Sequence, residues 1–417
     1  MKSKTIFVGL LFVSMTILLV GVASGAEQVT LRLSTAGEGT DVPVHVRLEL
    51  PRALADVPLE EISAELRQTD TGQVVPGQLI GADDGKMELW WILPQAKAGD
   101  KSTWIATLER QAGPDGKLFL WKDERGRYLD LLLGGNKVTR YMYEYDTSSE
   151  QRTFETYKPF HHVFDASGNL LTNGPDGSHP YLKDKIFYPH HRGIFIGWNR
   201  LALEAQRYDF WHMNGVQQVH QRFLELVAGP VLARSKALIH WNDKSGKPII
   251  AEHRQTTVFR QNAPTILLLD FCTELKAVRG EVFLNGDPEH AGFQYRAHND
   301  VAAGSQDGKA KYLFHNDSIN PKKNNDLPWA GMSYGLTSGY YSVQYMNHPD
   351  NPKDTVYSAY RDYGRFGAFF KKEIGTGQTL TLRYRLWVGH GKMPERQKLA
   401  NRYVVFVDSP KVEVLRR

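Results

Sequence analysis

The sequence has very little cysteine and no concentrated block of basic residues. Its 417 residues include a single cysteine, Cys272. One thiol excludes an intrachain disulfide, and it excludes metal or iron–sulfur sites that are built from several cysteines. The net charge is only +5, and Lys and Arg are spread along the chain, so a nucleic-acid-binding protein is not expected.

The motifs of several common enzyme classes are also absent. The chain has no His-Glu-x-x-His zinc motif, no Gly-x-Gly-x-x-Gly dinucleotide motif and no Walker-type phosphate loop. Residues 331–335 match Gly-x-Ser-x-Gly, but the flanking sequence predicts neither the strand nor the helix that a nucleophile elbow requires. A Rossmann enzyme, a kinase, a zincin or an α/β-hydrolase is therefore not expected.

The N-terminus has the composition of an export signal. Residues 1–26 contain Lys2 and Lys4, then an apolar run over 6–22, then small residues ending at Ala26. This order predicts a cleavable secretory signal peptide, and so a mature protein that is soluble and periplasmic or extracellular. No other run of about 18 apolar residues is present, so we expect no membrane span in the mature chain.

Strand patterns predict a first domain over residues 27–110. Apolar and polar residues alternate there, for example over 42–50, as is typical of half-buried strands. Pro43 cannot donate a hydrogen bond to a neighbouring strand, so its strand is expected at a sheet edge or to begin there. A short helix is expected within 59–66. We interpret this part as a small β-sandwich, followed by a polar Gly/Pro link over 111–117.

The remaining residues, 117–417, predict a larger domain of the same class. Short strands continue, separated by long loops rich in Asp, Asn, Gly and Pro, and a helix is indicated only at about 393–403. No repeat of fixed period is visible, which does not favour a propeller or solenoid. The sequence thus predicts an all-β protein in which a small N-terminal β-sandwich is followed by a large double-sheet β-sandwich.

The sharpest candidate segment for chemistry runs from Tyr188 to Asn199. His190, His191 and Arg192 lead directly into an apolar strand that contains Trp198. If this part is extended, His190 and Arg192 share one face and His191 takes the other. Only one of the two histidines would then point into a given cleft, unless a loop or bulge intervenes.

Two further segments carry polar side chains beside aromatic ones. Residues 208–215 place Trp211 among Asp, His and Asn, a mixture that suits sugar binding because aromatic rings pack on C–H faces while hydroxyls need donors and acceptors. In residues 289–300, strand geometry puts Arg296 and His298 on one face with Gln294. Arg and His two residues apart favour the floor of a polar cleft over an ordinary surface strand.

A fourth segment contains a turn and a row of cations. His348 lies in a Pro/Asn/Asp-rich turn, and Arg361, Tyr363 and Arg365 would align on one strand face. Such rows can neutralise a carboxylate or sulfate. We expect His190 or His191, Arg296, His298, His348 and Arg361 to meet in one cleft. The candidate catalytic residues are His190, His191, His298 and His348, and the candidate substrate-binding residues are Arg192, Trp198, Trp211, Arg296, Arg361 and Tyr363.

The metal question stays open at this point. Fifteen histidines are present, and imidazole is a common metal ligand. No two of them have a strong ligand spacing, so the sequence assigns no metal ligands, and a divalent metal remains possible as a cofactor.

A set of motifs between about Lys117 and His390 resembles a bacterial family labelled PmoA-like or methane oxygenase. The motifs are Pro189–Gly193, Asp209–Trp211, His348–Pro352, Tyr360–Gly364 and Arg383–Arg385 with a late His-Gly. The resemblance implies an exported protein and, by association, a role with carbohydrates. The methane oxygenase activity is rejected, because a subunit of that enzyme has several membrane-spanning helices and this chain reads as strands.

These observations leave two main functions open. The first is a secreted carbohydrate-active enzyme that cleaves a glycosidic bond of an oligo- or polysaccharide. Elimination, which needs a base such as His or Tyr and a cation, or a metal-assisted step is favoured over hydrolysis, which usually needs two carboxylates. Asp209, Glu289, Asp300 and Asp362 are available for hydrolysis, but no pairing is visible. The second is a non-catalytic carbohydrate-binding protein of the cell envelope, and a purely structural envelope protein is a third reading.

Overall fold

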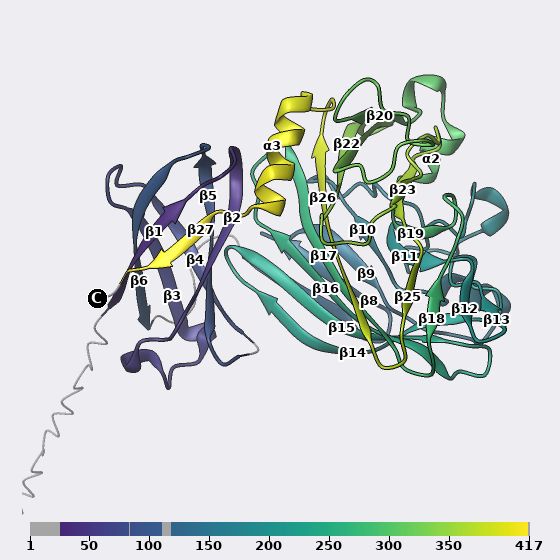
Figure 1. Ribbon diagram of the computed structural model, residues 1–417, viewed down its shortest axis with the longest axis horizontal. Coiled ribbons are helices and arrows are strands. Elements are labelled where there is room, and N and C mark those ends of the chain that lie inside the picture. Colours follow the sequence, from purple (N-terminus) through teal and green to yellow (C-terminus); the bar gives the residue numbers. More distant parts are fainter. Residues whose placement is uncertain (1–25, 83, 111–117, 416–417) are drawn as a thin grey trace, which may run out of the picture.

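The computed structural model describes residues 26–82, 84–110 and 118–415. The predicted signal peptide, apart from its last residue, and the predicted link at 111–117 lie outside these ranges. The chain is 51% strand and 9% helix, and Figure 1 shows a small β domain beside a large one. The predicted all-β fold is confirmed. No helix in the described ranges is long and apolar enough to cross a membrane.

The small domain is a seven-stranded antiparallel sheet with the order β2-β5-β4-β3-β6-β1-β27. Alternate residues such as Val29, Leu31 and Leu33 are buried in its core. Strand β2 lies at an edge, as Pro43 predicted. The strand bounds are β1 (Glu27–Ser34), β2 (Gly39–Leu48), β3 (Ile62–Gln68), β4 (Val74–Gly81), β5 (Met87–Ala96), β6 (Lys101–Arg110) and β27 (Lys411–Val414).

The helix expected within residues 59–66 is wrong. Only a short 3-10 turn is present at Leu59–Glu61, and strand β3 follows it directly. Ile62 and Leu66 are both buried in the core of the small domain, with Ala64 packed against the same core. This spacing of two residues fits a strand and not a helix.

The last described strand, β27, belongs to the first sheet. It pairs antiparallel with β1, so that Val414 lies opposite Leu31 and Lys411 lies opposite Ser34. In Figure 1 this yellow strand lies among the purple and blue strands of the small domain. Residues 411–414 were predicted to belong to the large domain, whereas they form a strand of the small domain.

The large domain is a sandwich of two eight-stranded sheets. One, named here the β19 sheet, has the order β23-β24-β19-β11-β10-β9-β8-β7. Its strands are β7 (Phe119–Glu124), β8 (Tyr128–Leu133), β9 (Asn136–Met142), β10 (Phe160–Val163), β11 (Ile194–Trp198), β19 (Ala291–Arg296), β23 (Val356–Tyr357) and β24 (Arg365–Phe369).

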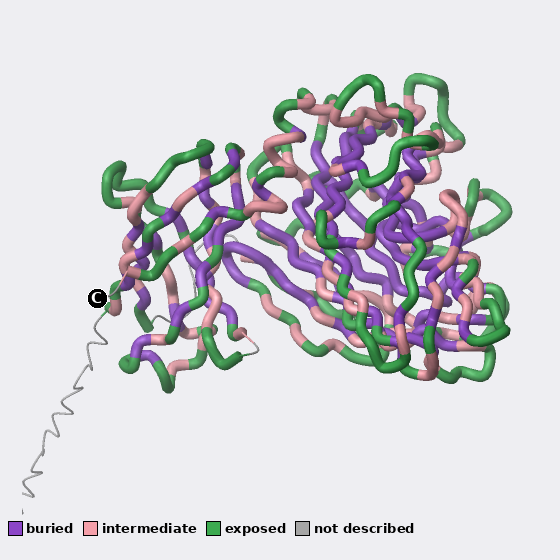
Figure 2. Tube along the Cα trace, in the orientation of Figure 1, coloured by how far each residue is buried: buried purple, intermediate pink, exposed green. Residues whose placement is uncertain are grey.

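The second sheet, named here the β17 sheet, has the order β14-β15-β16-β17-β26-β22-β21-β20. Its strands are β14 (Gln217–Ala228), β15 (Leu232–Asn242), β16 (Pro248–Phe259), β17 (Thr265–Ala277), β20 (Lys311–Phe314), β21 (Trp329–Leu336), β22 (Gly339–Asn347) and β26 (Thr379–His390). The two sheets share one core, where the Phe293 ring lies 4.3 Å from that of Phe271 and 4.6 Å from that of Tyr384. Figure 2 shows this buried interior as purple tube with exposed loops around it.

Few other elements are present in the described ranges. A four-stranded sheet contains β12 (Leu201–Leu203), β13 (Gln206–Tyr208), β18 (Val282–Leu284) and β25 (Lys372–Ile374). The α-helices are α1 (Glu150–Thr156), α2 (Asn299–Ala303) and α3 (Arg396–Val407), and short 3-10 turns are also present at Arg52–Leu54, Lys183–Lys185 and Gln306–Gly308. Helix α3 confirms the expected C-terminal helix, and the two shorter helices were not expected.

The core of the large domain contains a fully buried ion pair. The Glu252 and Arg254 side chains on β16 form two hydrogen bonds of 2.7 and 3.0 Å. The Glu252 carboxylate also accepts from the Trp241 indole at 2.8 Å and from the Thr273 hydroxyl at 2.9 Å. Four bonds therefore satisfy a charge that would otherwise be costly to bury.

The two domains are fixed to each other by polar and apolar contacts. The Gln78 side-chain oxygen in β4 accepts hydrogen bonds from the backbone N–H groups of Val231 and Leu232, each at 3.0 Å. The ring of Trp90 in β5 lies 5.6 Å from that of Phe259 in β16. Their relative placement therefore rests on specific side chains of both domains.

Acid is expected to destabilise the large domain through buried His162. Its ring nitrogens lie 3.0 Å from the Thr172 hydroxyl and 3.0 Å from the Pro175 carbonyl oxygen. Burial lowers the pKa of His162 to about 4, below the value near 6.5 of an unfolded chain. As the pH falls below about 6.5, the unfolded state takes up the proton first, so up to about 3 kcal/mol of stability is lost by about pH 4.

Chemical denaturation at pH 7 and at pH 4.5 measures this effect. The His162→Gln variant should lose less free energy of unfolding between the two pH values than the unchanged protein. His253→Gln serves as a control, because His253 is substantially exposed on β16. An unchanged pH dependence in His162→Gln would contradict the assignment.

Candidate functional site

The candidate site lies on the face of the β19 sheet that points away from the sandwich core. In β11, Ile194 and Ile196 belong to the main core cluster, whereas Phe195 packs with Trp211 on the opposite face. In β19, Phe293 and Tyr295 likewise lie in the core. This confirms the predicted division of faces, so that Gln294 and Arg296 lie on the side of Phe195.

A tight turn before β11 places two histidines side by side. Tyr188 has a positive φ of 54°, and its carbonyl oxygen accepts a hydrogen bond of 2.9 Å from the His191 N–H. The His190 and His191 rings are consequently only 4.1 Å apart. The extended geometry that would put them on opposite faces is not present, because this segment is a turn, and the exception of a loop is the one that applies.

Arg192 points away from these two histidines. Its guanidinium donates to the carbonyl oxygens of Glu155 and Phe154 and lies 4.1 Å from the centre of the Tyr157 ring. The side chain is fully buried. It holds helix α1 against the sheet and does not reach the candidate site, contrary to the predicted substrate-binding role.

A second loop lies directly over β11 and brings a third histidine. The Phe210 N–H donates to the Trp198 carbonyl at 2.9 Å. This close approach requires a glycine at 197, because a Cβ atom there would lie 2.2 Å from the Phe210 carbonyl oxygen. The loop seats Trp211 in the sheet and places the His212 ring 4.6 Å from that of His190.

The fourth histidine precedes β19. The His290 ring lies 4.8 Å from that of His212 and 6.0 Å from that of His191. We refer to His190, His191, His212 and His290 as the histidine centre. The side chains of His212 and His290 are 29% and 28% exposed, so solvent and ligands reach the centre past these two.

Two of the four imidazoles are oriented by carboxylates. The Nδ1 atom of His212 lies 2.8 Å from Asp209 Oδ2, and that of His290 lies 2.9 Å from Asp287 Oδ1. Because Nδ1 is bonded to a carboxylate, Nε2 is the atom of each ring that is left for chemistry.

The other two imidazoles have unused nitrogen atoms. Nε2 of His190 and both ring nitrogens of His191 are buried without a hydrogen-bond partner in the described part of the chain. Burial lowers the pKa of His190 to about 2 and the pKa of His191 well below its ordinary value. Both rings are therefore neutral near pH 7, and His190, His191 and His290 are close enough to share a metal ion.

Buried cations adjoin the centre. The Lys158 ammonium donates to the Trp211 carbonyl at 2.7 Å. Arg365 is fully buried and donates to Gln294 Oε1 at 3.1 Å and to the Tyr363 hydroxyl at 3.2 Å, while its Nη2 has no partner among the described residues. This unused donor makes Arg365 a candidate for binding a ligand anion.

Arg296 also adjoins the centre, but most of its donors are engaged. Its Nη1 donates to the carbonyl oxygens of Ala297 and Tyr363, and its Nη2 donates to that of Phe187 at 3.3 Å. Arg296 therefore braces the loops that carry the Tyr188 and Tyr363 rings, which lie 4.4 Å apart. Tyr188 is 47% exposed and offers a surface on which a sugar ring can pack.

The structure does not bring all the predicted site residues together. His190, His191, Trp211, Arg296 and Tyr363 converge, Trp198, His298 and His348 do not join them, and the charge of Arg361 is engaged by a carboxylate. Trp198 is buried in the sandwich core and donates to the Phe370 carbonyl. His298 caps helix α2 and lines a separate cavity with Asp176 and His179. His348 packs on Phe406, and Arg361 forms an ion pair with Glu289 beside His290.

The sequence contained a signal for the two histidines that the prediction missed. Both follow the pattern Asp-x-x-His, as Asp209 to His212 and Asp287 to His290. The Asp209 carboxylate accepts from the backbone N–H groups of Trp211 and His212, so that one turn places acid and imidazole together. The pattern is not specific alone, because it also occurs at Asp176–His179, where the histidine is 84% exposed.

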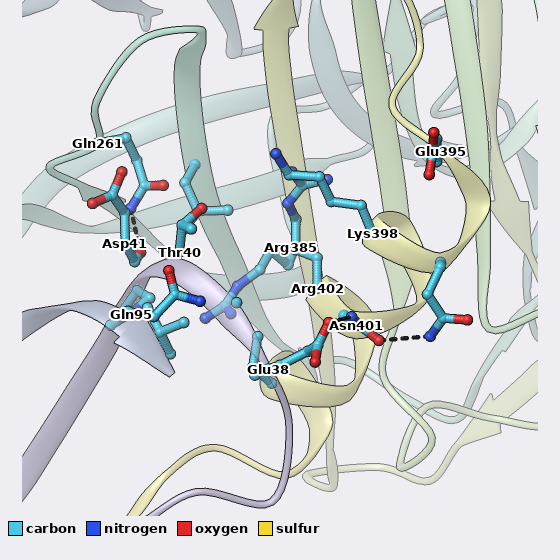
Figure 3. A pocket seen from close by; sticks show the side chains of 16 residues that line it. Glu38, Thr40, Asp41, Gln95, Gln261, Arg385, Glu395, Lys398, Asn401 and Arg402 are labelled. Carbon is cyan, nitrogen blue, oxygen red and sulfur yellow. Dashed lines mark hydrogen bonds between the residues drawn. The ribbon is translucent and has the colours of Figure 1, made fainter. Parts of the chain in front are cut away.

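A second polar cavity, of about 310 Å³, lies at the junction of the two domains. Figure 3 shows its lining, which includes Glu38, Thr40, Asp41, Gln95, Arg385, Lys398 and Arg402. Its two arginines are engaged: Arg385 pairs with Asp270, and Arg402 donates to Gln344 at 2.7 Å. Burial and the neighbouring Arg385 lower the pKa of Arg402 to about 9. We interpret this cavity as part of the domain junction.

Comparisons with known proteins give one family match. No curated protein sequence matches the chain, and the PmoA-like resemblance stays a prediction. Among solved structures, an α-mannosidase from Enterococcus faecalis V583 is 11% identical with a TM-score of 0.45, over 94% of this chain and 46% of that one. A heparan sulfate lyase HepC mutant from Pedobacter heparinus is 11% identical with a TM-score of 0.36, over 69% and 38%.

The chain thus spans less than half the length of either structure. The family match covers about two thirds of this chain. It runs over residues 128–403, which includes the whole histidine centre and the buried cations beside it. The chain belongs to the family of unknown function DUF6807.

Proposed function

We propose that the protein is an exported carbohydrate-active enzyme that cleaves a glycosidic bond of an anionic saccharide by elimination at the histidine centre. One observation carries the proposal. The imidazole of His212 is oriented by Asp209, and the guanidinium carbon of Arg365, whose Nη2 has no partner among the described residues, lies 5.8 Å from the centre of the ring of the preceding residue, Trp211. These are the base and the cation that an elimination next to a carboxylate requires.

The proposed reaction needs neither an oxidant nor water. The His212 Nε2 atom removes the proton from the carbon next to the substrate carboxylate. The electrons of that C–H bond form a carbon–carbon double bond, and the bond from the next carbon to the glycosidic oxygen breaks. Tyr363 accepts a hydrogen bond from Arg365 Nε, so its own hydroxyl proton can be given to the leaving oxygen. Arg365 stabilises the charge that develops on the carboxylate.

Hydrolysis by two carboxylates is supported less well. Glu289 is held by Arg361, and Asp300 lies beside His298 at helix α2. Asp362 is exposed, and Asp209 is held by His212. Three of these four acidic candidates are thus engaged by a histidine or an arginine, whereas hydrolysis usually needs two carboxylates that act as general acid and as base or nucleophile.

Activity on a panel of saccharides tests the proposal. Uronic-acid oligosaccharides should give products that absorb ultraviolet light, because the new double bond is conjugated with the carboxylate, and matched neutral oligosaccharides should not. Saturated products would indicate hydrolysis and overturn the elimination. If the intact protein binds a saccharide but never converts it, the function is that of a non-catalytic carbohydrate-binding protein and not of an enzyme.

Replacing Arg365 with lysine is expected to lower kcat/KM on a uronate substrate by about 10–100-fold. Lysine keeps the charge but loses the forked donor that reaches Gln294, Tyr363 and a ligand together. Steady-state kinetics on the same oligosaccharide measures this. His253→Ala, on the other sheet, is the control and should keep the full rate. A folded Arg365→Lys variant with the full kcat/KM would contradict the proposed role of Arg365 in binding the substrate.

Export is part of the proposal and can be tested separately. Residues 1–26 carry the pattern of a cleavable signal, which lies outside the described residues except for Ala26. Mass spectrometry of the protein from its native host should find a chain that begins near Glu27. A cytoplasmic product that retains Met1 would contradict export without affecting the proposed chemistry.

A further inference from the structure

We propose that His190, His191 and His290 together bind one divalent transition-metal ion of the zinc type. This inference deepens the proposed function, on which it rests for the role of the ion, because it assigns a cofactor to the same centre. The binding itself can be measured without any substrate, so the two proposals can fail separately.

The geometry of the three imidazoles fits a shared ion. Each residue offers one ligand nitrogen, and these three atoms all lie within 4.8 Å of one another. Zinc–nitrogen bonds of about 2.0–2.1 Å in a tetrahedral site place ligand atoms about 3.4 Å apart. Small rotations of the three side chains would bring the nitrogen atoms to this spacing.

The unused nitrogen atoms are the second observation. Buried polar atoms nearly always have a partner, and exceptions call for one that has not been accounted for, such as water or an ion. His190 Nε2 and both His191 nitrogens are buried without a protein partner in the described ranges. A metal ion satisfies an imidazole lone pair directly, and neutral imidazole is the form that binds it.

His290 has the carboxylate that commonly accompanies a metal-binding histidine. Asp287 Oδ1 lies 2.9 Å from His290 Nδ1, which leaves Nε2 as the ligand atom. Asp287 is itself held by the Asn199 amide at 2.8 Å and by Arg200 at 3.4 Å. The ring of His290 is therefore fixed in orientation before any ion binds.

The surrounding charges indicate what else the ion would bind. Lys158, Arg296 and Arg365 are buried nearby, although burial and the Arg192 charge hold the pKa of Lys158 well below its usual range. The three imidazoles add no negative charge. An ion with three protein ligands keeps an open position, and the positive charges of the buried Arg296 and Arg365 favour an anionic group there, such as the carboxylate of the proposed substrate.

Metal content of the purified protein is the first test. Protein without an affinity tag, saturated with Zn²⁺ and then dialysed, should retain about one ion per chain by elemental analysis. Co²⁺ in place of Zn²⁺ should give the visible absorption of a low-coordinate nitrogen site. Protein that is folded but retains no ion, with either metal, would overturn the proposal.

Matched variants then test the ligand set. His290→Ala and His191→Ala should lose the ion, and Asp287→Asn should weaken metal affinity by about 10–100-fold. Asp209→Asn is the matched control, because Asp209 orients His212, which is not a ligand in this proposal, so metal affinity should be unchanged. Equal weakening in Asp209→Asn and Asp287→Asn would overturn the ligand set. If His290→Ala fails to fold, the metal affinity of Asp287→Asn still tests whether His290 is a ligand.

The outcomes separate this proposal from the proposed function. If the protein binds one metal ion per chain but converts no saccharide, the metal site is supported and the proposed enzymatic function is contradicted. If turnover persists after complete removal of the metal, the enzymatic function is supported and a catalytic role for the ion is contradicted. Loss of the ion from His212→Ala would also contradict the three-ligand set.

Discussion

Replacing His212 with alanine is expected to lower the turnover of a saccharide substrate by about 10²–10⁴-fold, the usual contribution of a general base. The Nδ1 atom of His212 lies 2.8 Å from Asp209 Oδ2, so Nε2 is the ring nitrogen that is left to take up a proton. Substrate affinity should change little, because the proton is transferred only in the transition state. Separate measurement of kcat and KM distinguishes these effects.

His179→Ala is the matched control for this prediction. His179 has the same Asp-x-x-His spacing, but it is 84% exposed and lies outside the histidine centre. It should keep the full rate. Asp209→Asn should lower kcat as well, because the amide no longer fixes the tautomer of His212. An unchanged kcat in folded His212→Ala would remove His212 as the base.

Replacing Glu252 with alanine is expected to lower the free energy of unfolding by about 3–5 kcal/mol. Glu252 is fully buried in the sandwich core. Its removal leaves the Arg254 guanidinium as a buried charge without its carboxylate, and it leaves the Trp241 and Thr273 donors unpaired. Chemical denaturation of the large domain, followed by tryptophan fluorescence, measures the loss.

Glu65→Ala provides the control for this loss. Glu65 and Arg67 on β3 have the same spacing of two residues along a strand, but their side chains are 55% and 56% exposed. Exposed ion pairs contribute between zero and about 1 kcal/mol. Similar losses in Glu252→Ala and Glu65→Ala would contradict the view that burial sets the cost.

Much of the fold could be predicted because strand periodicity is local. The alternation of Val29, Leu31 and Leu33 in β1 is visible in the sequence, and Pro43 marked its strand as an edge strand. The return of residues 411–414 to β1 could not be predicted in this way. It depends on a partner almost 400 residues away, and a four-residue strand carries little pattern of its own.

The site was predicted in part, for reasons that particular residues make clear. The segment with His190 and His191 was identified from the sequence. The alternation of a strand would put their rings on opposite faces, whereas the turn at Tyr188 puts them side by side. His298 and His348 looked alike in the sequence, yet each accepts a bond from a backbone N–H two residues later. A histidine that makes such a local bond and a catalytic histidine cannot be told apart from the sequence, because the difference depends on which other side chains the fold brings beside the ring.

The pairing of β27 with β1 also determines the order in which the chain can fold. During synthesis, roughly 300 residues separate β6 from β27, and at about 5–20 residues per second they take about 15–60 s to appear. Throughout that time one edge of β1 has no partner strand, and an open edge is a template for aggregation. The small domain appears first but is completed last, so a chain that stops before Lys411 is expected to aggregate even when its large domain has folded.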